Sequence, residues 1–490
     1  MYTARVAEVL RANGHDVVVV CQEPHPERYP WIDAWATLDA NGPSTLTESG
    51  AERTAGRCVL LRPRIGDLLP TFVIDRYEGF PTVRRFVDLT DEQLRSYLAT
   101  NVEALRAAVA WHDSRIVIAG HAIPGPVIAA RALGPGRYVA KVHGSDIEYA
   151  IRKQDRYVHL AHEGLTGAKA VIGGSKDVLE RCEGLVPGIS GLLSVIPPGV
   201  DTGAFRPRPR RDALLETADL VDDDPSPVRG RTASLDPQVV DALARRDAGA
   251  IDALAESYDQ GVPDPGASAT LRQLAGSNRP VVGYLGKLIP QKGVELLLAA
   301  RATLPQDPVA LIVGFGSHRE WLTALAIALR NRDGEALEWL STGRMDVDLS
   351  TLGDRHHTGD DADVLFTGRL DHRYAPGAVA AMDVLVVPSI LDEAFGMVAA
   401  EGAAAGALPM VARHSGLAEV AEALEGDVDR PGLFSFEPGP GAGTRLTAGI
   451  DRLLSLPARE RGELRRAVSA FAEGAWSWDR TAALLLAAAR

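Results

Sequence analysis

Short apolar runs rich in β-branched residues recur along the chain, each bounded by glycine, proline or polar residues. Runs of four or five such residues are too short for a helix and predict buried strands. Longer segments with helical spacing of apolar positions separate them, such as Met397–Ala405, which stops at Gly406. This alternation predicts a parallel sheet covered on both faces by helices. The strands predicted in the second half are Val281–Leu285, Val309–Val313, Val364–Thr367, Val384–Val387 and Leu408–Ala412.

The first half repeats the alternation. Residues 2–13 predict an amphipathic helix that stops at Asn13-Gly14, and Asp91–Trp111 predicts a long helix. Ser175 is the expected N-cap of a helix over Lys176–Cys182. The strands predicted here are Asp16–Val20, Cys58–Leu61, Thr71–Ile74, Arg115–Ala119, Arg137–Val142, Ala170–Ile172 and Leu192–Ile196.

The composition changes between residues 206 and 275, where proline, arginine and aspartate dominate. With one helical stretch, Gln238–Tyr258, this segment predicts a partly disordered linker or insertion. The expected organisation is an N-terminal Rossmann-like domain over 1–205, this linker over 206–275 and a second Rossmann-like domain over 276–475. A last helix is expected over 476–490.

Composition narrows the function classes. The 490 residues suffice for two domains, and the formal net charge of −13 argues against nucleic-acid binding, which needs a basic footprint. Three distant cysteines (Cys21, Cys58 and Cys182) fit a reducing compartment, and no run of about 18 apolar residues occurs. A cytoplasmic enzyme is expected, with peripheral contact to the inner membrane face left open.

Two carboxylates frame the predicted strand–loop–helix unit after Val384–Val387. Glu393 lies in the loop and Glu401 in the helix, with seven residues between them. Amides of Gly396, Met397 and Val398 open the helix, where a phosphate can bind. Ionised carboxylates accept hydrogen bonds from hydroxyls, so the pair suits the two polyol ends of a nucleotide sugar. The alternative, of equal weight at this point, is that Glu401 lies on a solvated helix face and Glu393 in an ordinary acidic loop.

The string E-A-F-G-M-V-A-A-E (393–401), preceded by P-S and followed by G-A-L-P-M-V-A and S-G-L-A-E, resembles the E-x7-E signature of retaining GT-B glycosyltransferases. More narrowly, it resembles the group-1 family that includes sucrose-phosphate synthases and bacterial α-mannosyltransferases. The resemblance implies two Rossmann-like domains facing across a cleft, with the C-terminal helix crossing back to the first domain. It also implies that Glu393 contacts the donor sugar, Glu401 the ribose, and backbone near Gly368, Arg369 and Leu370 the base.

Lys287 and Lys292 follow a predicted strand, five residues apart, in a Gly- and Pro-containing loop. Two cations there would neutralise a diphosphate leaving group without a metal ion. The matching family motif has arginine at the first position, so Lys287 keeps the charge and loses the bidentate grip. Two solvated surface lysines are the alternative.

His143 ends a predicted strand in H-G-S-D and by itself suggests a polar cap. The resemblance assigns it the role of a histidine that reaches the donor sugar from the first domain, so His143 and Glu393 are the expected catalytic residues. His121 is a weaker candidate, acceptor-side or structural.

Two further motifs suggest a dinucleotide site and a metal site, and neither is well supported. Gly314-Phe315-Gly316 has Arg319 where a dinucleotide fingerprint needs its third glycine. The cluster His356-His357 with Asp360, Asp361 and Asp363 predicts a polar loop rather than a metal site, because adjacent histidines point apart. No metal and no cofactor are therefore expected, with the nucleoside diphosphate sugar as substrate.

The predicted helix over 2–13 precedes the predicted strand over 16–20, whereas the family carries a strand and a Gly-rich loop before this helix. A chain shortened at its start is therefore expected. The function expected is metal-independent, retaining transfer of a hexose from a nucleoside diphosphate sugar to an unknown hydroxyl acceptor. The alternatives are a GT-B phosphorylase or epimerase, and a nonenzymatic nucleotide-sugar-binding GT-B protein inactivated by loss of that loop.

Overall fold

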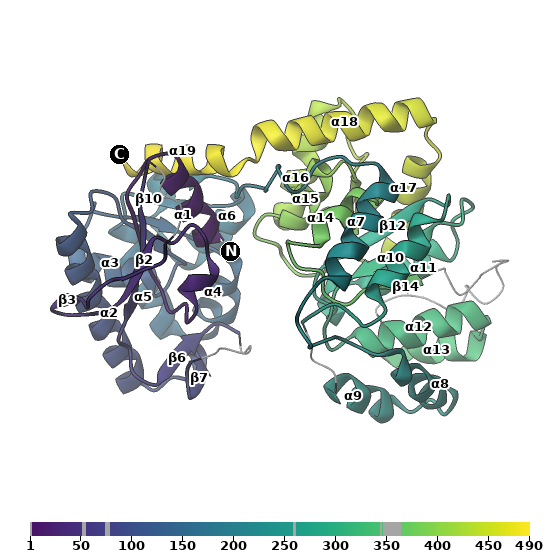
Figure 1. Ribbon diagram of the computed structural model, residues 1–490, viewed down its shortest axis with the longest axis horizontal. Coiled ribbons are helices and arrows are strands. Elements are labelled where there is room, and N and C mark those ends of the chain that lie inside the picture. The colour runs from purple at the N-terminus through teal and green to yellow at the C-terminus, as the bar shows by residue number, and fades with distance from the viewer. Residues whose placement is uncertain (1, 51–54, 74–78, 258–260, 344, 346–363) are drawn as a thin grey trace. The chain divides into compact units, whose positions relative to one another are not determined.

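The chain forms two compact units, which we call unit 1 (Met1–Gly199 with Ser477–Arg490) and unit 2 (Val200–Trp476) (Figure 1). The computed structural model describes residues 2–50, 55–73, 79–257, 261–343, 345 and 364–490. The division falls six residues before the predicted end of the first domain, and the segment predicted as a linker belongs to unit 2.

Unit 2 is built on a six-stranded parallel sheet with strand order β14-β13-β12-β15-β16-β17. The order runs outward in both directions from β12 and β15, so these two central strands form the topological switch point of a doubly wound fold. Parallel strands place all their carboxyl ends at one edge. The strands are β12 (Val281–Leu285), β13 (Val309–Val313), β14 (Val364–Phe366), β15 (Val384–Val387), β16 (Leu408–Ala412) and β17 (Ser435–Phe436).

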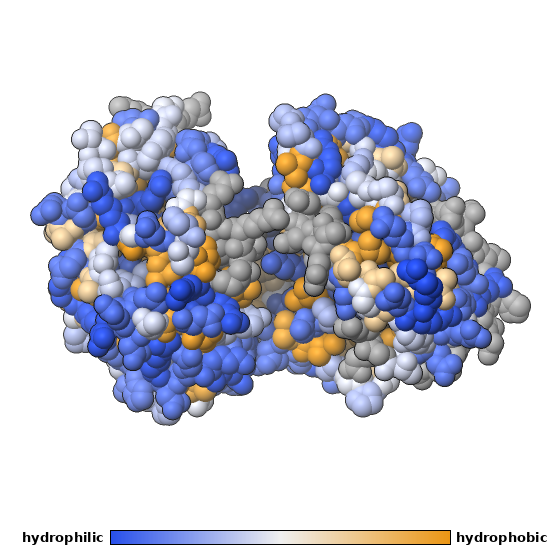
Figure 2. All heavy atoms as spheres, turned by 90° about the horizontal axis from the view of Figure 1, so that it is seen from below, coloured by the Kyte–Doolittle hydropathy of each residue, from blue (hydrophilic) through white to orange (hydrophobic). Residues whose placement is uncertain are grey.

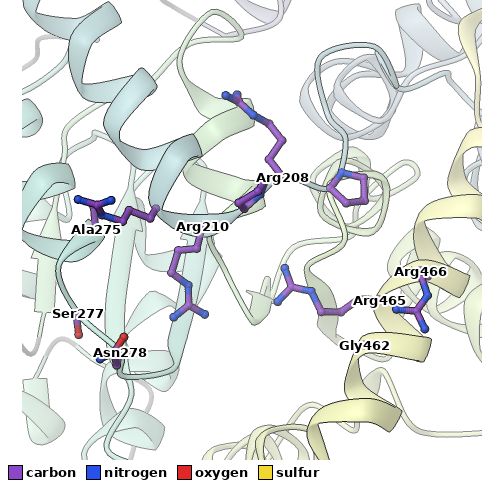
Figure 3. Close-up of a pocket in the computed structure, with 11 residues that line it drawn as sticks. Arg208, Arg210, Ala275, Ser277, Asn278, Gly462, Arg465 and Arg466 are labelled. Carbon is purple, nitrogen blue, oxygen red and sulfur yellow. The ribbon is translucent and has the colours of Figure 1, made fainter.

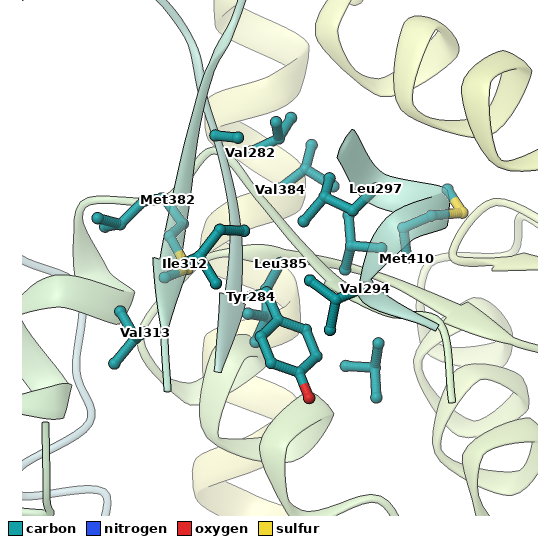
Figure 4. Packing of buried hydrophobic residues seen from close by; sticks show 14 of the residues in the cluster. Val282, Tyr284, Val294, Leu297, Ile312, Val313, Met382, Val384, Leu385 and Met410 are labelled. Atoms are coloured by element: carbon teal, nitrogen blue, oxygen red, sulfur yellow. The ribbon is translucent and has the colours of Figure 1, made fainter. Parts of the chain in front are cut away.

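Strands β13, β15 and β16 are buried along their whole length, and β12 is buried except at its last residue, as their continuous apolar sequences predict. Figure 4 shows their side chains packed together with Val294 and Leu297 of α11. Gly283 permits the close packing, because a Cβ there would lie 2.1 Å from the sulfur of Met382. The predicted strands at 281–285, 309–313, 384–387 and 408–412 are confirmed.

Twelve α-helices of the described residues accompany this sheet. Helices α11 and α17 pack on each other, and α15 packs on α18. The helices of unit 2 are α7 (Arg210–Asp222), α8 (Asp236–Ala244), α9 (Ala248–Ser257), α10 (Ala267–Ala275), α11 (Val294–Arg301), α12 (Arg319–Asn331), α13 (Gly334–Gly343), α14 (Ala375–Ala380), α15 (Met397–Ala404), α16 (Ser415–Asp427), α17 (Ala442–Leu454) and α18 (Ala458–Ala475).

The predicted linker over 206–275 is corrected by the structure, since its described residues include the four helices α7 to α10. Helix α7 packs on α10 and α14, and α8 packs on α9 and α12. The buried residues of α7 recur with helical period (Ala213, Leu214, Thr217, Ala218 and Val221), a signal that the surrounding charge and proline obscured. The single predicted helix over 238–258 is two helices.

Unit 1 contains two sheets built mainly of parallel strands. In the first, β1, β5 and β2 are parallel and the short strands β3 and β4 pair antiparallel with β2. The second is parallel, in the order β11-β10-β9-β8, and β6 and β7 form a separate parallel pair. The strands are β1 (Val17–Val20), β2 (Ala34–Asp39), β3 (Gly42–Pro43), β4 (Thr47–Glu48), β5 (Cys58–Pro63), β6 (Leu68–Thr71), β7 (Thr82–Arg85), β8 (Ile118–Gly120), β9 (Val139–Lys141), β10 (Ala170–Gly173) and β11 (Leu193–Val195).

The last helix of the chain, α19 (Trp478–Ala489), belongs to unit 1 and packs on α1 (Figure 1). The rings of Tyr2 and Trp478 meet edge to face with centroids 5.5 Å apart, and the Thr481 hydroxyl donates to the Pro197 carbonyl at 2.9 Å. The predicted return of the C-terminal helix and the α/β class are confirmed. The other helices of unit 1 are α1 (Tyr2–Ala12), α2 (Asp91–His112), α3 (Gly125–Leu133), α4 (Gly144–Tyr149), α5 (Asp155–Thr166) and α6 (Lys176–Leu185).

Some strands of unit 1 differ from the predictions. Strands β2, β3, β4 and β7 were not predicted. The strand expected over Thr71–Ile74 overlaps β6, Leu68–Thr71, only at Thr71, and Ile74 lies outside the described residues. Hydrophilic residues cover most of the visible surface of each unit (Figure 2). Within the described part of the chain, no helix is both long and apolar enough to cross a membrane.

Candidate functional site

The loops that follow β12 and β15 meet at the carboxyl edge of the unit 2 sheet. The first contains Lys292, at the end of a 3-10 turn over Pro290–Lys292, and the second contains Glu393. The Lys292 ammonium donates a hydrogen bond to Glu393 Oε1 and forms an ion pair with it. A backbone hydrogen bond of 2.8 Å from Ile390 to Gln291 ties the two loops together. The sequence therefore brings one cation and one anion into contact at the switch point, where ligands of doubly wound folds bind.

Glu393 is positioned by the start of α16. Its amide donates to Ser415 Oγ at 2.9 Å, and its carbonyl accepts from the Gly416 amide at 3.0 Å. The side chains of Lys292 and Glu393 are 23% and 26% exposed, so the pair is accessible and still partly desolvated. For Lys292, this position excludes the alternative of a fully solvated surface lysine.

Helix α15 begins directly after this loop, with Gly396 as its N-cap. Gly396 is left-handed, with φ of 99°, and no side chain caps the helix. A side chain at this position would also crowd Leu417, since a Cβ would lie 2.8 Å from its Cδ2. The first amides of a helix have no acceptor within it, so those of Met397 and Val398 are available to an anion.

Glu401 lies on the second turn of α15 and its side chain is only 7% exposed. The alternative of a solvated helix face is therefore wrong. Its carboxylate Oε1 lies 3.4 Å from Nε2 of His372. His372 stands two residues after the predicted base-binding loop. Its contact with Glu401 therefore links that loop to α15.

The Gly368–Leu370 loop follows β14 at the same edge. Gly368 has φ of 71° and its carbonyl accepts from the Gly314 amide at 2.9 Å, while Leu370 is buried. The Arg369 guanidinium lies 5.6 Å from the centroid of the Phe315 ring, and the Lys287 ammonium lies 6.0 Å from the same centroid. Phe315 thus presents an aromatic face between two predicted site residues.

Unit 1 carries His143, which directly precedes α4. Its ring centroid lies 4.7 Å from that of His121 and 5.5 Å from that of Tyr2. Burial, with further contributions from His121 and Lys141, lowers the pKa of His143 to about 3. The imidazole is therefore neutral around pH 7.

The groups around His143 form a second cluster, at the carboxyl ends of β8 and β9. Lys141 is buried, its ammonium lies 5.1 Å from the centroid of the Tyr2 ring, and burial lowers its pKa to about 7. Asp146 is fully buried and accepts hydrogen bonds from the amides of Ala122 and His143. His121 Nδ1 lies 3.7 Å from Asp146 Oδ2, which places the weaker candidate beside the stronger one.

Sequence reasoning missed several residues of these clusters. Ser415 stands in the quoted S-G-L-A-E string, and Phe315 in the glycine turn set aside as a dinucleotide motif. His372 and Lys141 gave no local signal, because only the fold brings them to Glu401 and His143. Among the described residues, no group of three or more His, Cys, Asp or Glu side chains could hold a metal ion. The cluster of His356-His357, Asp360, Asp361 and Asp363 lies outside those residues.

Residues 327–455 match the family model "Glycosyl transferases group 1". The match covers α13, β14 to β17 and α14 to α17, with part of α12. It therefore contains Glu393, Glu401 and the Gly368–Leu370 loop.

Curated relatives include GDP-mannose-dependent α-(1-6)-phosphatidylinositol monomannoside mannosyltransferases. The one from Mycolicibacterium smegmatis is 32% identical over 32% of this chain and 36% of its own length. The one from Mycobacterium tuberculosis is 26% identical over 64% of this chain and 61% of its own length. Glycogen synthase 2 from Nitrosococcus oceani is 24% identical over 41% of this chain and 35% of its own length. The chain thus spans between about a third and three fifths of these relatives.

Solved structures match nearly the whole chain. A sucrose-phosphate synthase from Thermosynechococcus elongatus matches with a TM-score of 0.52 and 18% identity, over 96% of this chain and 98% of its own. Anabaena Alr3699/HepE in complex with UDP and glucose matches with a TM-score of 0.54 and 16% identity, over 96% and 98%. These likenesses extend the agreement beyond the 327–455 segment to the fold of both units.

Proposed function

We propose that this chain, whose residues 327–455 match the group-1 glycosyltransferase model and whose fold is that of GT-B enzymes, transfers a hexose from a nucleoside diphosphate sugar to a hydroxyl acceptor. The transfer retains the anomeric configuration and needs no metal ion. Three free cysteines are consistent with action in the cytoplasm.

The observation that carries this proposal is the Lys292–Glu393 pair at the switch point, beside the uncapped start of α15. A diphosphate at those amides would lie between a cation and two carboxylates that accept hydrogen bonds from sugar hydroxyls. This combination suits a nucleotide sugar better than a free sugar or a free nucleotide, because each half of the ligand meets its own acidic acceptor.

Each predicted residue takes a distinct part in donor binding. Lys287, Lys292 and the amides of Gly396, Met397 and Val398 hold the diphosphate. Glu401, oriented by His372, accepts from the ribose hydroxyls. Backbone groups of the Gly368–Leu370 loop contact the base. Glu393 orients the hexose, and His143, a neutral hydrogen-bonding group in unit 1, is proposed for a sugar hydroxyl.

In the reaction, the bond between the anomeric carbon and the diphosphate oxygen breaks through an oxocarbenium-like transition state. The acceptor hydroxyl attacks from the same face, and its proton passes to the departing phosphate oxygen. Negative charge grows on the diphosphate as the bond breaks, where the two lysines and the helix amides stabilise it. No second carboxylate is needed as a nucleophile in this mechanism.

The donor base and sugar are left open by these contacts. The mycobacterial relatives are named as GDP-mannose-dependent, and Alr3699/HepE was crystallised with UDP and glucose. Both nucleotides therefore belong in a first screen. The same relatives are named for a phosphatidylinositol monomannoside acceptor, so lipid-linked acceptors and peripheral membrane contact belong in the acceptor screen.

The test is thermal stabilisation of the purified chain by UDP, GDP and ADP, with and without Mg²⁺. Ligand binding to the folded state raises the melting temperature by mass action. We expect one nucleotide to stabilise the chain equally with and without Mg²⁺. The matching sugar nucleotide is then incubated with acceptor candidates, and the anomer of the product is determined by NMR.

Stabilisation by none of the three nucleotides would refute the donor site. Binding without hydrolysis or transfer of any matching sugar nucleotide would favour the nonenzymatic alternative. A product of inverted configuration would refute retention while leaving the transferase assignment intact.

A further inference from the structure

A recess in unit 2, apart from the donor loops, is lined by arginines. It is a cavity of about 680 Å³ formed by the segment leading into α7, the turn after α10 and the middle of α18. In Figure 3 the side chain of Arg465 extends from α18 toward that of Arg210, which lies at the start of α7. The arginines that line it are Arg208, Arg210, Arg211, Arg465 and Arg466.

This cavity lies at the amino edge of the sheet, opposite the donor loops. Its lining residues Ser277 and Asn278 stand just before β12. Asp383, held by two of its arginines, directly precedes β15. Since β12 and β15 are parallel, their amino ends lie across the sheet from Lys292 and Glu393. The recess is therefore separate from the site described above.

Positive charge exceeds negative charge in the cavity wall. Arg210 and Arg465 share one carboxylate, Asp383, with an Arg465 Nη1 to Asp383 Oδ1 distance of 3.2 Å. Arg208 pairs with Glu216. In the described part of the chain, Arg211 and Arg466 have no carboxylate within ion-pair distance, and both are exposed. Five guanidinium groups thus meet two carboxylates, in a chain whose net charge is −13.

The start of α7 adds backbone donors to these charges. Pro209 is its N-cap, no side chain caps the helix, and Pro209, Arg210 and Arg211 all line the cavity. Free amides and the positive end of the helix dipole therefore border the same space as the guanidinium groups. Both features favour an anion with several oxygens.

We propose that this cavity binds a small phosphorylated molecule carrying more than one phosphate group. Guanidinium groups grip phosphate oxygens in pairs, and the volume falls within the range of about 300–1,000 Å³ that small-molecule sites occupy. The recessed shape, with arginines on facing walls, suits a compact ligand that two walls can hold at once. This inference does not depend on the proposed transferase reaction.

The test is calorimetric titration of the full chain with inorganic tripolyphosphate. Because the donor site would also attract this probe, the titration is made in a Lys292→Ala background. We expect binding there, and at least a tenfold loss of affinity when Arg211→Ala and Arg466→Ala are added. Arg459→Ala, on the same α18 and 91% exposed, is the matched control and should change affinity less than about twofold.

Two further comparisons test whether the cavity prefers phosphate and guanidinium contacts. Citrate, a trianion without phosphate, should bind at least tenfold more weakly than tripolyphosphate; equal binding would refute the phosphate class. Arg466→Lys should recover part of the affinity lost in Arg466→Ala, because lysine restores the positive charge but not the paired donors of the planar guanidinium.

No tripolyphosphate binding in the Lys292→Ala background, or equal affinity with and without Arg211 and Arg466, would overturn the proposal. Since both arginines are exposed, their variants should keep the melting temperature of the parent, and this is checked first.

Discussion

The side-chain clusters at the carboxyl ends of the strands carry different charges in the two units. In unit 2, Lys292 and Glu393 hold full opposite charges in contact, and Glu401 has His372 beside it. In unit 1, burial lowers the pKa of Lys141 to about 7 and that of His143 to about 3, around the buried carboxylate of Asp146. The same parallel-sheet geometry thus yields one strongly ionic cluster and one cluster with little net charge.

This difference fits two kinds of ligand. An accessible cation beside free helix amides suits the charged diphosphate of a donor. A neutral imidazole, which can both donate and accept a hydrogen bond, suits uncharged hydroxyl groups. Substitutions and pH measurements can test each half of this contrast.

Removing the cation of unit 2 should have the largest effect. In Lys292→Ala, the growing charge of the leaving diphosphate loses a charged donor, and Glu393 is left without its partner. We expect kcat for transfer to fall about 10²- to 10³-fold, the range seen when one transition-state donor is lost. Steady-state kinetics with the donor found by thermal shift measures this.

Lys292→Arg separates charge from geometry and should retain more activity than the alanine variant. Arg459→Ala serves as the control for removal of a positive charge from unit 2. A Lys292→Ala enzyme within threefold of the parent would show that the ion pair is only structural, and the contrast between the units would lose its functional meaning.

The second prediction concerns pH and unit 1. Below pH 6.5 an unfolded histidine gains a proton, whereas His143 stays neutral in the folded chain until about pH 3. Its folded pKa is lowered, so the unfolded state binds more protons and stability falls as the pH drops from 6.5 toward 3. Lys141 also lowers the stability as the pH falls, but between pH 10.5 and about 7, because its folded pKa is about 7. This loss of stability lies above the range from pH 6.5 to 3.

His143→Asn should therefore lose less thermal stability between pH 6.5 and pH 5 than the parent, measured by differential scanning calorimetry. His159→Asn, an exposed histidine on α5, controls for the general effect of removing a titrating ring. Parallel pH profiles for the parent and His143→Asn would mean that burial does not hold this imidazole neutral.

The ionic cluster of Lys292 and Glu393 in unit 2 was largely predictable from sequence, whereas the cluster around His143 in unit 1 was not. Val384–Val387, the turn at Gly396 and α15 carry short-range signals, so the strand, loop and helix could be placed together with Glu393 and Glu401. Lys287 and Lys292 follow a strand that is equally clear. For His143 the sequence predicted a strand end, but the burial that sets its charge comes from Tyr2, His121 and Lys141.

Two further features escaped sequence reasoning for separate physical reasons. In α7 to α10 the apolar spacing was present, but proline and charged residues dominated the local composition. The arginine-lined cavity needs Arg208 and Arg466 to border the same space, and residues so distant in sequence come to do so only through the fold of unit 2 around the amino edge of the sheet. Strand β2 alternates buried and half-buried residues, a weaker pattern than a continuous apolar run.

The third prediction tests Glu401 as a binding residue. Glu401→Gln keeps the shape of the side chain and replaces one charged acceptor oxygen with an amide donor. If the carboxylate accepts from the ribose, affinity for the nucleoside diphosphate should fall about tenfold, roughly 1.4 kcal/mol, with little change in kcat at saturation. Unchanged nucleotide affinity would remove Glu401 from the donor site.

The smallest effect is expected at Ser415, which positions Glu393 without touching the substrate. Its Oγ accepts from the Glu393 amide at 2.9 Å, so Ser415→Ala frees the loop by one hydrogen bond, worth about 1 kcal/mol. We expect kcat to fall about three- to fivefold while nucleotide affinity, which depends on Glu401 and the helix amides, stays constant. Ser415→Thr restores the hydroxyl and should recover kcat. Equal losses in both variants would trace the effect to the left-handed backbone at this residue, with φ of 50°, rather than to the hydrogen bond that sets Glu393 against Lys292.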